Sequence, residues 1–264
     1  MRQTVKTTIL RRLIPSTWWD TARHHYYATR EHGWFRSQLR TVVAGEGTRK
    51  VAAITFDDGP HPADTPRMLE VLARHQVPAT FFFLGRNVEA HPDVARAVVQ
   101  AGHDIGNHTY DHPHLPSCGV RQVISEVRRC QRAIREATGL SPVIMRPPYG
   151  AQSAQSFLAI RALGYQIVHW SASGHDWLGD DASIVAGRVM KGMLPGRIIL
   201  LHDNLEPPPG QTAWRPEQAG LRDRRPTADA LDDLIRTLRG DGYDFVTVTE
   251  LLRQGTPKRR SWFD

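Results

Sequence analysis

Two adjacent carboxylates, Asp57 and Asp58, form the first group of candidate catalytic residues in this sequence. They come directly after the apolar run 51–56, which is typical of a buried strand, and Gly59-Pro60 then predicts a turn. At the end of a strand, one carboxylate can bind a metal ion while its neighbour accepts a proton. Asp, Gly and Pro are also common in solvated turns, so the pair becomes informative only together with residues further along the chain.

Histidines supply the second group of candidate residues. His108 and His112 are four residues apart, and on a helical turn this spacing would place both imidazoles on one side, where they could bind a single divalent ion. Such pairs are often incidental. Combined with Asp58, however, they make a set of two imidazoles and one carboxylate with open coordination positions, which suits zinc, iron, cobalt, nickel or manganese.

An arginine and two histidine–aspartate groups follow later in the chain. Arg146 precedes two prolines, which would hold it rigidly, and its guanidinium could fix a carboxylate such as Asp57. Aspartates accompany histidines at 175–177 and at 202–203. An aspartate near a histidine orients the imidazole and keeps it protonated, as a general acid requires.

The elements that would position these groups alternate between strand-like and helix-like segments. Predicted strands lie at 51–56, 79–84, 103–107, 143–145, 165–170, 197–201 and 244–248. Predicted helices lie at 64–74, 91–101, 120–138, 153–163, 182–191 and 227–239. This alternation predicts an α/β fold in which about seven parallel strands form a distorted (β/α) barrel. Because the carboxyl ends of barrel strands carry the chemistry, the Asp, His and Arg residues that follow them would face one site.

The positive charge of the chain is concentrated in its first 50 residues. The 264 residues contain 34 Lys and Arg and 27 Asp and Glu, which gives a net charge of +7. Residues 1–50 hold ten of the basic and three of the acidic side chains, so 24 of each remain in residues 51–264. A neutral body without a clustered basic stripe argues against binding of nucleic acid. Cys118 and Cys130 are expected to be free thiols.

Three regions are expected: a basic, aromatic N-terminal extension at 1–50, a catalytic domain at 51–252 and a basic C-terminal tail at 253–264. The extension would either pack on the domain or touch an anionic membrane surface. Its apolar stretches are too short for the core of an export signal, which favours a cytoplasmic protein, whereas an extracellular one would imply a different start of the chain. The proline-rich stretch 204–226 predicts a long loop.

Five stretches in this order resemble the motifs of the polysaccharide deacetylase family, which is also called carbohydrate esterase family 4 or the NodB-like homology domain. They are Thr55-Phe-Asp-Asp-Gly-Pro60, His108-Thr-Tyr-Asp-His112, Arg146-Pro-Pro-Tyr149, Asp176-Trp177 and Leu200-Leu-His202. Each stretch alone is weak evidence of the family, but all five in this order are specific to it. The likeness covers about residues 51–252. The resemblance implies a distorted (β/α) barrel and metal-dependent removal of acetyl groups, N-acetyl before O-acetyl, from a carbohydrate or amino sugar.

The resemblance also implies which residues bind the metal and activate water. Asp58, His108 and His112 would hold one divalent metal ion, with zinc expected first and cobalt, nickel or manganese as alternatives. Asp57 would be the base that takes a proton from the metal-activated water. Arg146 would orient Asp57.

On the side of the leaving group, the resemblance implies an acid and an acyl pocket. His202 would be the acid that protonates the departing nitrogen, held by Asp176. The backbone amide of Tyr149 would help to bind the oxyanion, and Trp177 and Leu200 would line the pocket for the acetyl group.

Two departures and two alternatives accompany this expectation. Family members often have an aspartate three residues before the Asp-Trp pair, where this chain has Ser173, and most extracellular members would show an export signal. We interpret Ser173 as affecting local structure rather than chemistry. A hydrolase of another non-peptide C–N bond, such as a deformylase or a ring amidase, would use the same residues. A non-catalytic carbohydrate-binding relic would be expected to lack a metal ligand or the acid, and here all six candidate positions are present.

Overall fold

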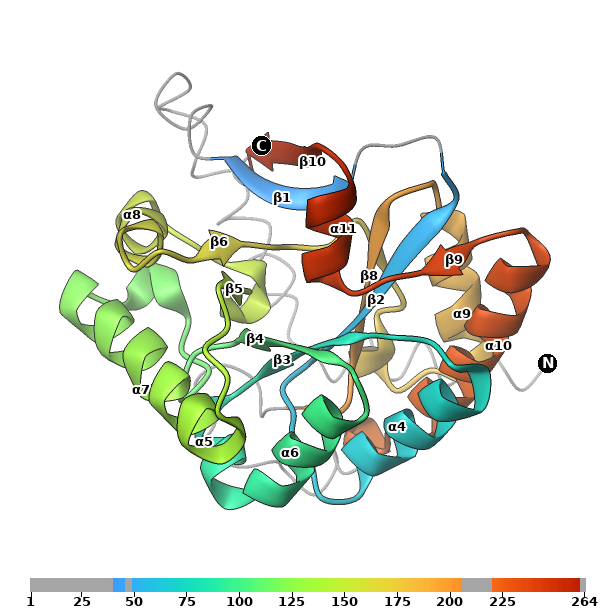
Figure 1. Cartoon of the computed structure of the whole chain (residues 1–264), viewed down its shortest axis with the longest axis horizontal. Coiled ribbons are helices and arrows are strands. Elements are labelled where there is room, and N and C mark those ends of the chain that lie inside the picture. The colour runs from blue at the N-terminus through green and yellow to red at the C-terminus, as the bar shows by residue number, and fades with distance from the viewer. Residues whose placement is uncertain (1–39, 46–48, 206–219, 262–264) are drawn as a thin grey trace, which may run out of the picture. The chain divides into compact units, whose positions relative to one another are not determined.

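The computed structural model describes residues 40–45, 49–205 and 220–261 of the chain (Figure 1). The chain divides into two compact units, one comprising Met1–Arg40 with Arg260–Asp264 and the other Thr41–Arg259. The second unit contains all of the predicted site residues. Most of the expected N-terminal extension, and the loop residues 206–219, lie outside the described residues. Within the described ranges, no helix combines the length and the apolar character that crossing a membrane requires.

A curled sheet of mostly parallel strands forms the centre of the larger unit. Within the described residues the strands are β1 (Arg40–Gly45), β2 (Val51–Asp57), β3 (Thr80–Phe83), β4 (Asp104–Asn107), β5 (Ile144–Met145), β6 (Gln166–Ile167), β7 (Ala172–Ser173), β8 (Arg197–His202), β9 (Asp244–Phe245) and β10 (Pro257–Ser261). Strands β8, β2, β3, β4, β5 and β6 are parallel neighbours in this order, and β1 pairs antiparallel with β8. Because β7 pairs with β8, the chain that leaves β6 returns to the other end of the row, so the sheet curls back on itself.

Helices cover the outside of the sheet, except for α11 (Val248–Gln254), whose Val248 and Leu251 belong to the same buried cluster as Ala53 of β2 (Figure 1). Among the described residues they are α4 (Asp64–His75), α5 (Gly85–Ala90), α6 (Pro92–Gln100), α7 (Val120–Thr138), α8 (Ala154–Ala162), α9 (Ala182–Lys191), α10 (Arg225–Gly240) and α11 (Val248–Gln254). Phe56 and Leu201 of the sheet belong to one buried cluster with Met68 of α4 and Leu234 of α10. Removal of this apolar surface from water is the main force that holds the helices on the sheet.

The alternation of side chains along the strands decides which residues reach the inside of the curled sheet. In β2, Phe56 faces the helices, whereas Ala53 belongs to an inner cluster with Ile198 of β8. Successive side chains of a strand point to opposite faces. Asp57 therefore shares the inner face with Ala53, and His202 shares it with Ile198.

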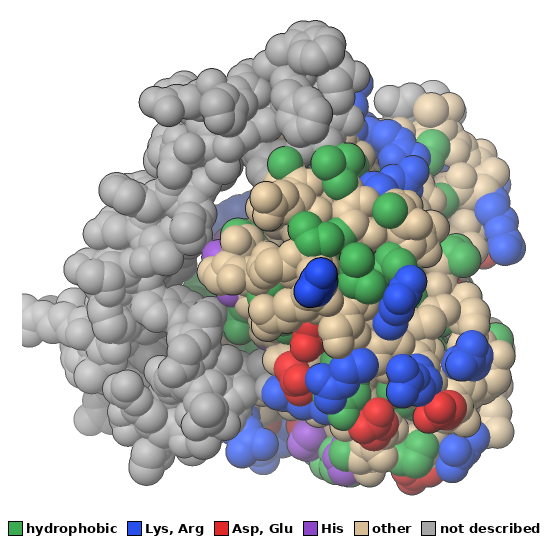
Figure 2. Space-filling view, turned by 90° about the vertical axis from the view of Figure 1, so that its left-hand side faces the viewer, with side chains coloured by type: hydrophobic (Ala, Val, Ile, Leu, Met, Phe, Trp, Pro, Cys, Tyr) green, Lys and Arg blue, Asp and Glu red, His purple; other side chains and the backbone are tan. Residues whose placement is uncertain are grey.

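Charged side chains of opposite sign mix on the surface. Figure 2 shows one face on which Lys and Arg lie among Asp and Glu over its lower part. Asp232 of α10, for example, is 2.8 Å from Arg74 of α4 and 3.0 Å from Arg236. Exposed ion pairs of this kind contribute about 0–1 kcal/mol each, so apolar packing, not charge pairing, fixes these helices.

The predicted alternation of strands and helices is present, with differences at its two ends and at two places within the chain. The predicted strand 244–248 is wrong beyond Phe245, because Val248 begins α11. The hydroxyl of Thr247 accepts the backbone N–H of Glu250 at 3.2 Å and caps this helix, which outweighs the strand preference of the β-branched residues around it. The sequence does not predict β1, α5 or α11, and the predicted strand 165–170 is shorter and is followed by β7.

Candidate active site

Asp58, His108 and His112 lie together beyond the carboxyl ends of β2 and β4. The Oδ1 atom of Asp58 is 3.3 Å from Nε2 of His108 and 3.2 Å from Nε2 of His112. One ligand atom from each of these buried side chains lies within 4.8 Å of the other two, and in the part of the chain that the structure describes this is the one group of its kind. The structure therefore brings the three predicted metal ligands together.

The turn after β2 carries the Asp58 carboxylate to the two histidines. Asp58 has a left-handed backbone conformation, with φ of 73°, which a residue with a side chain keeps only when its surroundings fix it. Here the backbone carbonyl oxygen of Asp58 accepts the side-chain amides of Asn87 at 2.8 Å and Asn204 at 3.2 Å. These bonds hold the turn from two separate segments of the chain.

The two histidines are not placed by a helical turn, as their spacing predicts, but by an irregular loop. Thr109 and His112 have left-handed φ values of 72° and 58°, which no helix accommodates. Glu126 of α7 fixes the loop, because its buried Oε2 accepts the backbone N–H groups of Tyr110 at 3.0 Å and Asp111 at 2.8 Å. The sequence gives no local signal for this support.

The donor set fits a divalent metal ion. Nδ1 of His108 bonds to the backbone carbonyl oxygen of Arg146 at 2.7 Å, and because a carbonyl can only accept, Nδ1 is the donor and Nε2 is the nitrogen left to bind a metal ion. Burial lowers the pKa of His112 to about 3, so this imidazole is neutral. Burial raises the pKa of Asp58, but the interactions with His112 and His108 outweigh it and hold that pKa well below its usual range. Two imidazoles and an ionised carboxylate are ligands that zinc and similar ions accept.

The second carboxylate, Asp57, is held by Arg146 inside the curled sheet. Nη1 of Arg146 donates to Oδ1 of Asp57 at 2.7 Å and to the hydroxyl of Thr55 at 2.8 Å. The remaining nitrogens of this fully buried guanidinium donate to the carbonyl oxygens of Val168 at 3.3 Å and His169 at 3.1 Å. Because Arg146 takes Oδ1, Oδ2 is the oxygen of Asp57 that faces the metal ligands, 3.8 Å from one ligand imidazole.

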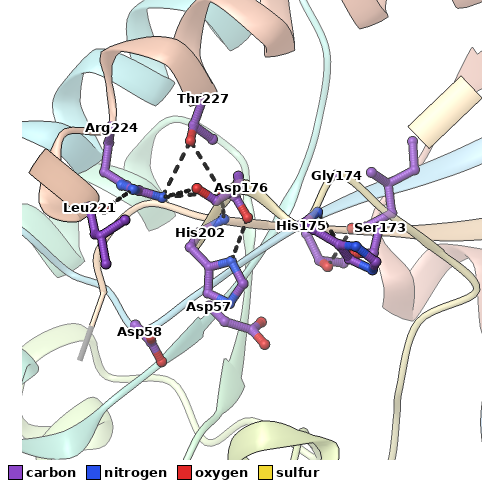
Figure 3. A network of polar contacts seen from close by, with 12 residues as sticks. Asp57, Asp58, Ser173, Gly174, His175, Asp176, His202, Leu221, Arg224 and Thr227 are labelled. Carbon is purple, nitrogen blue, oxygen red and sulfur yellow. Dashed lines mark hydrogen bonds and ion pairs between the residues drawn. The ribbon is translucent and has the colours of Figure 1, made fainter. Parts of the chain in front are cut away.

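His202, the last residue of β8, lies between these carboxylates and Asp176 of the 3₁₀ turn η4 (Asp176–Leu178) (Figure 3). Nδ1 of His202 is 2.8 Å from Oδ1 of Asp176, and its backbone N–H donates to Oδ2 at 2.9 Å. Burial opposes protonation, but the Asp176 carboxylate overcomes it and raises the pKa of His202 to about 9. The contact with Asp176 therefore favours the protonated form of the imidazole.

The three residues predicted to contact substrate lie around these groups. The ring of Tyr149, in the turn η3 (Pro148–Gly150), is 4.4 Å from the His112 ring, and the residue is 41% exposed. The Trp177 ring meets the His202 ring edge-on at 5.3 Å. Leu200 precedes His202 by two residues in β8 and so shares its inner face. The rings of Tyr149 and Trp177 therefore lie beside the polar groups, whereas Leu200 is almost fully buried.

Two further residues contact Asp176 and are not predicted from the sequence. Arg224 lies near the end of the predicted loop 204–226, directly before α10, which begins at Arg225, and Thr227 lies in the first turn of α10; both contact Asp176 (Figure 3). They follow no strand end, so no local pattern marks them. Ser173, where family members often have an aspartate, accepts the backbone N–H of His175 at 3.2 Å.

Comparison with known proteins relates the chain to a family of deacetylases. The polysaccharide deacetylase profile matches residues 44–168. A chitooligosaccharide deacetylase of Sinorhizobium fredii is 41% identical over 207 residues, which cover 78% of this chain and 93% of that protein. The peptidoglycan-N-acetylglucosamine deacetylase PgdA of Listeria monocytogenes is 35% identical over 217 residues, which cover 82% of this chain. The chain spans 42% of the length of that protein, less than half.

Solved structures show the same likeness. The Bc1960 peptidoglycan N-acetylglucosamine deacetylase superposes with a TM-score of 0.71 at 31% identity, covering 82% of this chain and 94% of that one. BA3943 from Bacillus anthracis, described as a CE4 family pseudoenzyme, superposes with a TM-score of 0.69 at 27% identity over 80% of this chain and 68% of that one. On these findings and the 41% identity above, the chain belongs to the polysaccharide deacetylase family.

Proposed function

We propose that the protein is a zinc-dependent deacetylase that removes the N-acetyl group from N-acetylglucosamine residues of an oligosaccharide or glycan. One observation carries the proposal: the metal-ligand set of Asp58, His108 and His112 lies beside a carboxylate fixed by Arg146, Asp57, and beside an imidazole held by Asp176, His202 (Figure 3). Relatives named for peptidoglycan N-acetylglucosamine and for chitooligosaccharides support the substrate class. A protein described as a pseudoenzyme shares this fold, so the residues of the site, and not the fold, distinguish an active enzyme.

Asp57 is placed to act as the base. When the oxygen of a water molecule attacks the acetyl carbon, Oδ2 of Asp57 takes one of the water protons while Arg146 holds Oδ1. A divalent ion bound by the ligand set would supply Lewis acidity, which draws electrons from the acetyl carbonyl oxygen and makes water easier to deprotonate. We propose zinc because two imidazoles and one carboxylate, with a position left open, are a common ligand set of catalytic zinc.

His202 is placed to act as the acid. When the C–N bond breaks, its electron pair goes to the nitrogen, which leaves only if it receives a proton. His202 donates that proton, and Asp176 stabilises the protonated ring beforehand through the bond to Nδ1. The products are acetate and a free amino sugar. Tyr149, Trp177 and Leu200 are proposed to bind the acetyl group and its oxyanion.

The direct test is acetate release by the purified full chain. The protein is stripped with a chelator, loaded with Zn²⁺, and offered N-acetylglucosamine oligomers and, separately, peptidoglycan. We expect equal amounts of acetate and new amine from at least one substrate, and neither from the stripped protein. If the zinc-loaded protein releases no acetate from any acetylated glycan, the proposal is wrong. Release of formate from formylated substrates would then favour the deformylase alternative.

A further inference from the structure

We propose that Arg224 and Thr227 are positioning residues for this reaction, which hold the Asp176 carboxylate in the orientation that supports His202. The inference rests on the proposed function, because it concerns the step in which His202 protonates the leaving nitrogen. It assigns a role to the start of α10, which lies after the long loop and outside the five sequence stretches that carry the family resemblance.

Asp176 uses both of its carboxylate oxygens in fixed contacts (Figure 3). Oδ1 is 2.8 Å from Nδ1 of His202. Oδ2 accepts the backbone N–H of His202 at 2.9 Å and the hydroxyl of Thr227 at 3.1 Å. Nη1 of Arg224 lies 3.5 Å from Oδ2 and donates to the backbone carbonyl oxygen of Asp176 at 3.2 Å. Arg224 therefore contacts both the side chain and the main chain of Asp176.

Arg224 is itself built into this place rather than resting on the surface. The residue is 1% exposed, and its other nitrogens donate to the backbone carbonyl oxygens of Leu221 and, at 3.3 Å, of Arg222. A buried guanidinium is tolerated only where its charge and its donors have partners. The carboxylate of Asp176 balances the charge of Arg224, and backbone carbonyl oxygens of the turn before α10 accept its other hydrogen bonds. These contacts connect this turn to Asp176 and, through it, to His202.

Without these contacts, the Asp176 side chain could rotate, and its two carboxylate oxygens could exchange places. With Oδ2 anchored by Thr227 and Arg224, Oδ1 remains directed at Nδ1 of His202. The ring is then held with Nε2 directed away from Asp176, toward Asp57 and Asp58 (Figure 3). Loss of an anchor would loosen the ring and slow proton delivery, without affecting the metal ligands or the base.

The closest test is a pair of substitutions at Thr227. Thr227→Val keeps the size of this buried side chain and removes the hydroxyl, whereas Thr227→Ser keeps the hydroxyl. In the zinc-loaded full chain, we expect Thr227→Val to lower kcat for an N-acetyl substrate roughly 10-fold, with KM nearly unchanged. The rate on an aryl acetate, whose leaving group needs no proton, should change little. Thr227→Ser should recover most of the lost rate.

Arg224→Ala provides a second arm with a matched control. We expect a roughly 10–100-fold loss on the N-acetyl substrate, again with less loss on the aryl acetate, and partial recovery on addition of guanidinium. The control is Arg225→Ala, because Arg225 is an exposed neighbour whose guanidinium pairs with Asp223 at 2.8 Å. It should leave the ratio of the two rates as in the wild type. If Arg224→Ala does not fold, the Thr227 pair decides.

A spectroscopic readout keeps this inference separate from the proposed function. The proton on Nδ1 of His202 should give a downfield NMR signal that disappears in His202→Ala, exchanges faster in Thr227→Val, and is retained in Thr227→Ser. Equal losses on both substrates in Thr227→Val, or an unchanged signal in that variant, would overturn the positioning role. A wild-type protein that hydrolyses no N-acetyl substrate contradicts the proposed function instead, and the signal then decides the inference by itself.

Discussion

Two buried aspartate–arginine pairs flank the metal-ligand set, and they differ in what they leave available. Arg146 donates to Oδ1 of Asp57 at 2.7 Å, and Oδ2 remains directed at the metal ligands. Asp176 has both oxygens engaged, one with the His202 side chain and the other with its backbone N–H and with α10. A carboxylate with one oxygen left over can accept a proton from substrate water, whereas a carboxylate with none can only support a neighbour. The comparison thus agrees with the proposed roles of Asp57 as the base and of Asp176 as the support of the acid.

The largest effect is expected from loss of a metal ligand, because the proposed base and the proposed acid both act on a substrate bound at the metal site. His108→Ala removes one of two imidazole ligands, so the variant should bind no zinc and lose hydrolysis of both N-acetyl and aryl acetate substrates. Elemental analysis and the two rates check this. Full zinc occupancy in the variant, or active wild-type protein without any metal, would contradict the role of His108 as a ligand of a catalytic metal.

Loss of the proposed base, Asp57, should slow hydrolysis whatever the leaving group of the substrate. Asp57→Asn keeps the shape of the side chain but cannot take up the proton, so we expect a loss on the order of 10²–10⁴-fold on both substrates, with zinc and fold retained. Asp233→Asn, an exposed aspartate of α10, is the matched control and should behave as the wild type. Near-normal turnover of Asp57→Asn would show that another group accepts the proton.

Replacement of each arginine by lysine should change the rates on the two substrates differently in the two aspartate–arginine pairs. Arg146→Lys keeps the charge but cannot donate to four partners at once, so the Asp57 carboxylate loosens and both substrates should slow by roughly 10–100-fold. Arg224→Lys should slow the N-acetyl substrate more than the aryl acetate. The ratio of the two rates is measured in each variant, and the same ratio in both would contradict the division into a base side and an acid side.

The smallest effect is a shift in pH dependence. His202 must be protonated to act as an acid, so activity falls as pH rises through its pKa, which the Asp176 carboxylate raises to about 9. Asp176→Asn removes that negative charge, so the alkaline limb of kcat/KM should move to lower pH, by about 1–3 units. A bound divalent ion lowers the pKa of His202 in both proteins, which is why the difference between their profiles is compared. A shift to higher pH would contradict the pairing.

Much of the site could be predicted because its residues follow apolar strands. Asp57, Asp58, His108 and Arg146 each come within one residue of the end of a strand, and His202 is the last residue of its own. Parallel strands deliver such residues to the same end of the sheet, so spacing along the chain was enough to predict that they meet.

The rest depends on contacts between segments that are distant in sequence. The loop between His108 and His112 takes left-handed conformations that Glu126 of α7 fixes, so a spacing of four residues could only suggest a helical turn. Arg224 and Thr227 contact Asp176 although they follow it by 48 and 51 residues in the sequence. The long stretch of chain between them does not indicate that they meet. Local patterns contain no information on such approaches.

The central claim is that the metal site and Asp57 attack the acyl group while His202 serves the leaving nitrogen. It is tested most directly by kcat/KM of His202→Ala on an N-acetyl substrate and on an aryl acetate, with zinc content measured in the same samples. An amide nitrogen leaves only when it is protonated, whereas an activated phenolate leaves unaided. The account predicts a loss on the order of 10²–10⁴-fold on the N-acetyl substrate and a much smaller loss on the aryl acetate, with zinc still bound. Equal losses on the two substrates would contradict it and leave His202 as a structural residue at the end of β8.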